Sequence, residues 1–137
     1  MDMAREAIGA MYESGTIPIN GRTYSLHPMR HLERRQVFAF FSEVMAEIES
    51  GRFGWLSRPE FAAVEAIMWR HLSLDGAIIA QTKDHWETYP DDYLELATLG
   101  MAVLSFPFLR GVGGGSASRA AATAVPIRSS KPTFQTP

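Results

Sequence analysis

The chain has 137 residues, of which 46% are hydrophobic and 20% are charged, and its formal net charge is −2. These values are typical of one small globular domain. The absence of cysteine excludes disulfides, thiolate metal sites and a cysteine nucleophile. No stretch approaches the roughly 20 apolar residues that cross a bilayer, and a net charge near zero argues against nucleic acid as the main partner. The first six residues are rich in charge and unlike a signal peptide, so we expect a cytoplasmic protein.

Residues 111–137 differ in composition from the rest of the chain. They hold three basic residues and no acidic one (+3), whereas residues 1–110 hold the other 10 basic residues against all 15 acidic ones (10 − 15 = −5). A glycine-rich run opens the segment, and mostly Ala, Ser, Thr and Pro follow it. Because glycine loses much backbone entropy on ordering and little apolar surface is available to bury, we predict a disordered basic tail. The folded domain is then expected to span residues 1–110.

A helix and a β-hairpin are expected at the start of the domain. Residues 2–14 have apolar positions at helical spacing, with Asp2 as the candidate N-cap and Gly15 as a residue that ends the helix. Apolar and polar residues then alternate over 16–26 around Asn20-Gly21, the preferred pair for a two-residue type I′ turn. Pro18 lacks an amide donor, so its strand is expected at the edge of a sheet.

Two amphipathic helices are expected next. The first spans residues 30–50, with Val37, Phe41, Val44 and Ile48 in one apolar stripe and Gly51 at its end. The second starts at a predicted capping box formed by Ser57 and Glu60 and runs to about Leu72.

Shorter elements fill residues 73–110. Asp75-Gly76 is expected to be a turn, Ile78-Ile79 a short apolar linker, and residues 83–88 a helical turn. A last helix begins near residue 90 and reaches about residue 105, and Pro107 stops it. The predicted fold class is therefore mainly α: a small helical domain with a short β-hairpin at about 16–26 and a disordered C-terminal tail.

Two histidine and carboxylate groupings suggest chemistry but have simpler interpretations. His27 and His31 have the spacing of metal ligands on one helix face, but Pro28 places His27 before the helix, so we interpret both as surface residues. The polar residues between 84 and 92 include the residue types that an acid–base cluster requires. Because acidic residues are expected at the first turn of a helix, we interpret this group as capping and solvated side chains: Asp84, His85, Glu87, Asp91 and Asp92.

The sequence contains no pattern that nominates an enzyme. It has no G-x-S-x-G, phosphate-binding glycine loop or H-E-x-x-H pattern. Arg30, Arg34 and Arg35 lie on one helix with Glu33 among them, which favours a solvated face over a phosphate-binding surface. We therefore predict a non-enzymatic protein with no cofactor and no metal, and with neither nucleic acid nor membrane as a partner.

The last helix is apolar on two sides. Leu94 and Met101 lie on one side, and Leu99 and Val103 lie on another. A surface helix normally has one apolar stripe, so this pattern indicates either central burial or a second contact surface. The aromatic residues of the helix at 30–50 also cover more than half of its circumference. The candidate protein-binding residues are Leu96, Leu99, Val103, Phe106, Phe108, Phe40 and, on the hairpin strand 22–26, Tyr24.

The order of these elements resembles that of a known protein family. The chain begins with a short helix and the hairpin sequence INGRTYSL at 19–26, which two amphipathic helices follow. The polar segment KDHWETYP at 83–90 then leads to a terminal apolar helix that ends in FPFL at 106–109. Together, over about residues 10–110, they resemble the tail assembly chaperones of long-tailed bacteriophages.

This resemblance implies a non-enzymatic protein in the host cytoplasm. Its members bind the long helical tape measure protein, keep it soluble and support assembly of the tail tube, so the implied partners are the tape measure protein, the tail tube protein and further copies of the chain. Two alternatives stay open: a structural head–tail connector or tail completion protein, and a small DNA-binding regulator with residues 57–72 as its recognition helix. The latter helix offers only Arg58 and Arg70 as basic residues.

Overall fold

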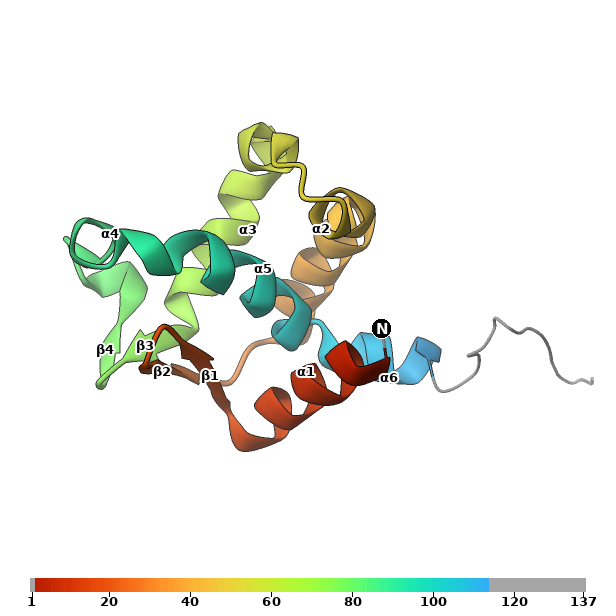
Figure 1. Ribbon diagram of the computed structural model, residues 1–137, viewed down its shortest axis with the longest axis horizontal. Helices are drawn as coiled ribbons and strands as arrows, with labels where there is room; N and C mark the ends of the chain where they lie inside the picture. Colours follow the sequence, from red (N-terminus) through yellow and green to blue (C-terminus); the bar gives the residue numbers. More distant parts are fainter. Residues whose placement is uncertain (1, 114–137) are drawn as a thin grey trace, which may run out of the picture. The chain divides into compact units, whose positions relative to one another are not determined.

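The computed structural model describes residues 2–113, and the side chains of residues 5–110. The chain divides after Ser105 into two units, which are described separately. The first contains α1 (Asp2–Ser14), α2 (His31–Glu49), α3 (Pro59–Arg70), α4 (His85–Thr88) and α5 (Tyr93–Leu104), and the second contains α6 (Phe106–Gly113) (Figure 1). Short 3₁₀ turns occupy Gly54–Ser57, Ile79–Gln81 and Pro90–Asp92. The predicted mainly α fold with an N-terminal hairpin is confirmed.

The start of the predicted tail is corrected by α6. Residues 111–113 belong to this helix and not to an unstructured segment, and Pro107 lies in its first turn. Proline is tolerated there because the first amide groups of a helix have no partner within the helix. Residues 114–137, over which the tail was also predicted, lie outside the described residues.

The N-terminal hairpin forms as its sequence predicts. Strands β1 (Thr16–Ile19) and β2 (Arg22–Leu26) pair antiparallel, with Ile19 opposite Arg22. The two intervening residues, Asn20 and Gly21, have φ of 50° and 81°, the positive values that a type I′ turn requires. Strand β1, which contains Pro18, lies at the edge of the sheet as expected.

A second hairpin, which was not predicted from the sequence, extends this sheet. The predicted helix ends at Arg70, and β3 (Leu72–Leu74) pairs antiparallel with β2, with Tyr24 opposite Leu74. Strand β4 (Ala77–Ile78) completes the order β1-β2-β3-β4. Asp75 and Gly76 have φ of 53° and 84°, which is the same turn chemistry as Asn20-Gly21. The linker assigned to residues 78–79 is therefore partly a strand, and β2 is an inner strand of the sheet.

Helices α2 and α3 form an antiparallel pair. At one end Arg70 Nη2 donates to Glu33 Oε2 at 2.9 Å, and at the other Arg58 pairs with Glu47. Between them, the ring of Phe61 stacks on Phe40 at 5.5 Å and meets Trp55 edge-on at 5.1 Å. These aromatic contacts fix the two helices against each other.

The predicted capping box at the start of α3 is wrong. Ser57 ends the preceding 3₁₀ turn, Arg58 is the N-cap residue without a side-chain capping bond, and Pro59 opens the helix. Proline at the first position already removes one unpaired amide and presets the helical φ angle, so α3 begins without a capping side chain.

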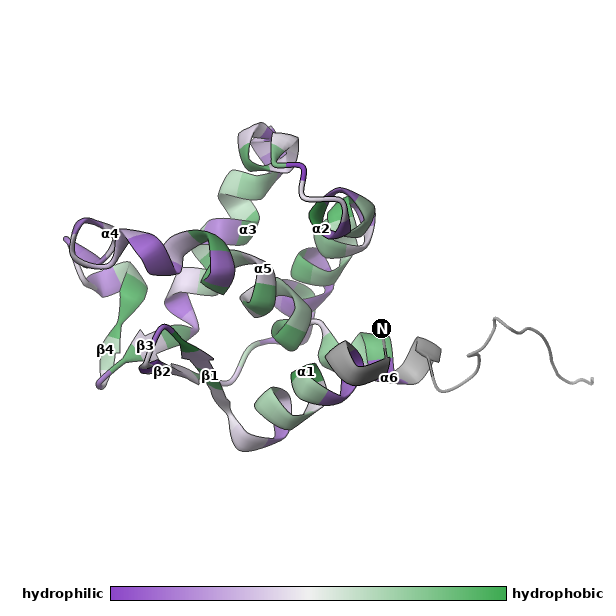
Figure 2. Cartoon of the chain, viewed as in Figure 1, coloured by the Kyte–Doolittle hydropathy of each residue, from purple (hydrophilic) through white to green (hydrophobic). Residues whose placement is uncertain are grey.

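Helix α5 lies at the centre of the first unit, among α1, α2 and α3 (Figure 1). Leu96, Ala97, Met101 and Val103 have no exposed surface, and Figure 2 shows most of the helix in the hydrophobic colour. At Gly100, an added Cβ would lie 2.9 Å from Met68 Cε and 3.6 Å from Leu72 Cδ1, so these two side chains pack directly against α5 at this position. Central burial therefore explains most of the apolarity of α5, while Leu94 and Leu99 are only half-buried.

Candidate functional site

A buried polar cluster joins the first hairpin to the start of α5. The carboxylate of Asp92 has no exposed surface and accepts four hydrogen bonds. Asn20 Nδ2 and Arg22 Nη2 each donate to Oδ1 at 2.8 Å, while Arg22 Nε at 2.7 Å and the hydroxyl of Tyr24 at 2.6 Å donate to Oδ2. The paired contact with Arg22 is the fork geometry that makes guanidinium–carboxylate bonds strong and directional.

His85 continues this cluster into α4. Its Nε2 lies 2.9 Å from the Tyr24 hydroxyl. Because that hydroxyl gives its one proton to Asp92, it accepts at this contact, and the His85 tautomer must carry its proton on Nε2. The hydrogen bonds thus run in one direction, from His85 through Tyr24 to Asp92.

The environment of the cluster fixes its protonation states. Hydrogen bonds from Arg22, and then from Tyr24 and Asn20, hold the pKa of the Asp92 carboxyl well below its ordinary range against the opposing effect of burial. Burial, followed by the bond to Asp92, raises the pKa of the Tyr24 hydroxyl. Burial also lowers the pKa of His85, although the Asp92 charge acts in the opposite direction. At neutral pH the cluster therefore contains a charged pair, a neutral tyrosine and a neutral histidine.

This arrangement corrects the interpretation of residues 84–92 as capping and solvated groups. Asp92 and His85 are buried, whereas Asp84, Glu87 and Asp91 are exposed as expected. In the sequence, only the residue types pointed to this buried cluster. Its spatial arrangement could not be predicted, because Asn20, Arg22 and Tyr24 reach Asp92 from about 70 positions earlier in the chain.

The buried cluster has the geometry of a structural tie, not of a catalytic centre. Tyr24 and Asp92 have no exposed surface and His85 is 4% exposed. The Asp92 oxygens are already occupied by donors, so the carboxylate has no capacity to take a proton from a substrate. Arg22 also lies over the ring of Tyr89 at 4.4 Å, which closes the outer side of the pair.

The two histidines suspected as metal ligands do not converge. His27 Nε2 lies 2.7 Å from Ser73 Oγ on β3, whereas His31 opens α2 and is exposed. Within residues 2–113, no group of three or more His, Cys, Asp or Glu side chains is arranged to hold a metal ion.

The three arginines of α2 do not form a shared phosphate-binding face. Arg34 Nη1 donates to the Leu104 carbonyl at 2.8 Å and lies over the Tyr12 ring, which ties α2 to α5 and α1. Arg30 and Arg35 are exposed.

Most of the sequence-predicted protein-binding residues are buried. Tyr24, Leu96 and Val103 have no exposed surface and Phe40 is 4% exposed, so none of these four presents a surface to a partner in this conformation. Leu99 is half-buried on α5. Phe106 and Phe108 lie on α6 in the second unit, where Arg110 lies over the Phe106 ring at 5.5 Å.

The exposed apolar surface lies elsewhere. Among the side chains that the structure describes, the large apolar residues with most of their surface exposed are Leu32, at 63%, and Phe53, at 53%. Phe53 follows α2 and forms a groove of about 440 Å³ with Ile48, Trp55 and Leu94; Asp91 and Glu95 line the same groove. We call it the Phe53 groove. Sequence periodicity missed it because Phe53 lies in a loop, outside any helical stripe.

No protein-family model, curated protein or solved structure matches this chain. Among residues 2–113, the helices are too short or too polar to cross a membrane.

Proposed function

We propose that this protein is a non-enzymatic tail assembly chaperone of a long-tailed bacteriophage and that it binds the helical tape measure protein. The observation that carries the proposal is the Phe53 groove, an apolar surface that the domain leaves open. The resemblance of residues 10–110 to such chaperones supplies the particular client.

The chemistry of the groove fits an amphipathic helix. Ile48, Phe53 and Leu94 offer apolar surface to the large residues of one helix stripe, in the way that helix-binding grooves generally do. Asp91 and Glu95 are exposed beside them, so the favoured client segment carries Lys or Arg next to its apolar stripe. These carboxylates contribute orientation and association rate more than affinity.

The buried cluster supports a binding role over an enzymatic one. The carboxylate of Asp92, the imidazole of His85 and the hydroxyl of Tyr24 hydrogen-bond to one another and hold the first hairpin against α4 and the start of α5. Because these groups hold the fold together, we assign the function to the exposed surface of the domain.

Co-expression with the tape measure protein of the same phage tests this proposal. The wild-type chain is expected to keep that protein soluble and to co-purify with it, and Phe53→Asp is expected to abolish both effects. Gln81→Asp is the matched control, because it adds the same charge at an exposed position outside the groove. Equal binding by the two variants, or a client that stays insoluble with the wild-type chain, would refute the proposal.

Purified phage particles distinguish a chaperone from a virion component. A chaperone leaves before the tail is complete, so quantitative mass spectrometry of mature particles is expected to lack this chain. A fixed number of copies per particle would instead identify a connector or tail completion protein.

A further inference from the structure

We infer that the exposed face of α2 and α3 binds a second copy of this chain, with the two α2 helices antiparallel about a two-fold axis near Ala39. This inference concerns a different surface from the Phe53 groove and does not depend on the identity of the client. It starts from a groove of about 410 Å³ between the two helices, whose apolar floor is formed by Phe40 and Val64. The small residues Ala39 and Ala63 line it and leave room for an approaching helix.

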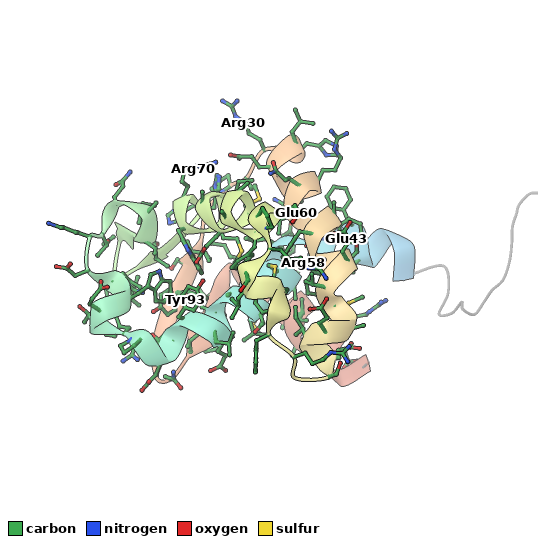
Figure 3. The ribbon with its side chains drawn as sticks, turned by 90° about the horizontal axis from the view of Figure 1, so that it is seen from above. Arg30, Glu43, Arg58, Glu60, Arg70 and Tyr93 are labelled. Carbon is green, nitrogen blue, oxygen red and sulfur yellow. The ribbon has the colours of Figure 1, made fainter. Side chains whose placement is uncertain are left out.

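The two ends of this face carry opposite charge. At the end where α2 begins and α3 finishes, three guanidinium groups stand against one carboxylate; at the other end, three carboxylates stand against one guanidinium. Figure 3 shows Arg30 and Arg70 towards one end and Glu43, Glu60 and Arg58 further along the pair. The basic end comprises Arg30, Arg35 and Arg70 with Glu33, and the acidic end comprises Glu43, Glu47 and Glu60 with Arg58.

The charges on the face remain available for contact. Arg35 and Glu60 are exposed, and the Glu43 side chain is 66% exposed, with its distance to Arg58 Nη1 at 3.9 Å. Arg58 instead bonds closely to Glu47. A face with separate positive and negative ends repels a copy placed parallel to it and attracts one placed antiparallel.

The spacing along α2 is self-complementary about Ala39. Arg35 lies four positions before Ala39 and Glu43 four positions after it, and all three are exposed. A two-fold axis at Ala39 therefore brings Arg35 of one copy opposite Glu43 of the other, twice, as an isologous contact requires.

The same axis covers the exposed leucine. Leu32 and Ala46 lie seven positions before and after Ala39, which is two helical turns in each direction. Leu32, which is 63% exposed, then packs over Ala46 of the second copy. An unrelated helix would have to match both the charge order and this spacing, whereas a second copy does so by symmetry.

Sedimentation equilibrium of the full chain tests the arrangement. The wild-type chain is expected to show a reversible monomer–dimer equilibrium. Arg35→Glu places two carboxylates opposite each other at both contacts, and Glu43→Arg places two guanidinium groups there, so each variant alone is expected to dimerise at least tenfold more weakly. An equimolar mixture of the two restores opposite charges at both contacts and is expected to form a heterodimer at least as readily as the wild type dimerises.

A second pair of variants tests the apolar part of the contact. Leu32→Asp is expected to weaken the dimer at least tenfold, while Phe53→Asp leaves it unchanged. Circular dichroism checks that all variants are folded, which is expected because every substituted position is exposed. A wild-type chain that is monomeric up to about 1 mM, a dimer insensitive to Leu32→Asp, or a mixture of the charge variants that stays monomeric would each overturn the inference.

Discussion

Tyr24 and Asp92, 68 residues apart in the chain, are joined by a 2.6 Å hydrogen bond between a hydroxyl and a carboxylate, and neither residue has exposed surface. This bond, with the Arg22 fork on the same carboxylate, fixes the first hairpin to the start of α5. The stability of the first unit is therefore expected to depend on one buried negative charge.

Asp92→Asn tests that dependence. The substitution leaves the Arg22 guanidinium without its counter-charge and turns an amide NH2 donor towards groups that also donate, so we expect a loss of about 2–3 kcal/mol in the free energy of unfolding. This is below the loss usual for a fully buried pair because Arg22 keeps some contact with solvent. Urea denaturation measures it. Asp91→Asn is the control, because its exposed carboxyl is one position away, and it is expected to change stability by less than about 0.5 kcal/mol.

Acid is expected to destabilise the protein in two steps. His85 is buried with a lowered pKa, so the unfolded chain binds a proton near pH 6.5 that the folded chain does not, and stability falls as the pH drops through this range. Asp92 has a depressed pKa, and its contribution is lost at lower pH, as the pH falls from its unfolded pKa near 3.8 towards its folded pKa.

Variants separate the two steps. His85→Gln is expected to flatten the stability profile between pH 7 and pH 5, the range in which an unfolded histidine with a pKa of about 6.5 takes up its proton. Asp92→Asn is expected to flatten the profile below about pH 4. Thermal melts across this pH series measure both. A profile that is identical in wild type and His85→Gln would contradict the assignment of the first step.

Two tyrosines are expected to resist ionisation in the folded protein. Burial, followed by bonds to Asp92 and Glu65 respectively, raises the pKa values of Tyr24 and Tyr93. Since the unfolded chain releases these protons near pH 10 and the folded chain retains them, stability is expected to fall as the pH rises above 10. Ultraviolet titration of the phenolate band checks this. Tyr24→Phe and Tyr93→Phe are each expected to remove one high-pH transition.

The turn of the second hairpin provides a test of backbone conformation. Gly76 has φ of 84°, and an added Cβ would meet nothing within 4 Å. Gly76→Ala therefore introduces strain in the backbone without a steric clash, and we expect it to cost about 1 kcal/mol. Ala77→Gly at the neighbouring exposed position, which has no such turn requirement, serves as a comparison in the same denaturation experiment. An alanine at position 76 that leaves stability unchanged would argue against this turn.

Ser57→Ala distinguishes the observed start of α3 from the predicted one. A true N-cap serine contributes about 1 kcal/mol, but Ser57 ends a 3₁₀ turn and Arg58 is the N-cap residue. The substitution is therefore expected to change the free energy of unfolding by less than about 0.5 kcal/mol. A larger loss would restore the capping box.

Local patterns predicted the helices and the first hairpin because their signals are contiguous. Asn20-Gly21 marks a turn, and the apolar stripe of 37–48 marks one face of α2. The second hairpin was missed although Asp75-Gly76 carries an equivalent turn signal, because its strands are only three and two residues long and a helical pattern ran up to Leu72. The second hairpin could have been predicted from Asp75-Gly76, because this pair favours the same two-residue turn as Asn20-Gly21.

The candidate sites were harder to predict than the fold. The apolar excess of α5 has the same appearance in sequence whether the helix is surrounded or exposed, and only the packing of α1, α2 and α3 around it decides between these. The burial of Asp92 depends on Asn20, Arg22 and Tyr24, whose approach no local window contains. Phe53 becomes significant only when the loop places it beside Leu94 of α5.

The connection of α2 and α3 to the sheet has a consequence for how this protein can vary. Leu26 and Leu72 are partners in the β2–β3 pairing, and the His27 amide donates to the His71 carbonyl at 2.9 Å. The segment that contains α2 and α3 therefore leaves the sheet after β2 and returns to it at the adjacent end of β3. The exposed residues 50–54 at its far tip, which include Phe53, can accept exchanges or inserted residues without shifting the strand register, so selectivity can diversify on a constant scaffold.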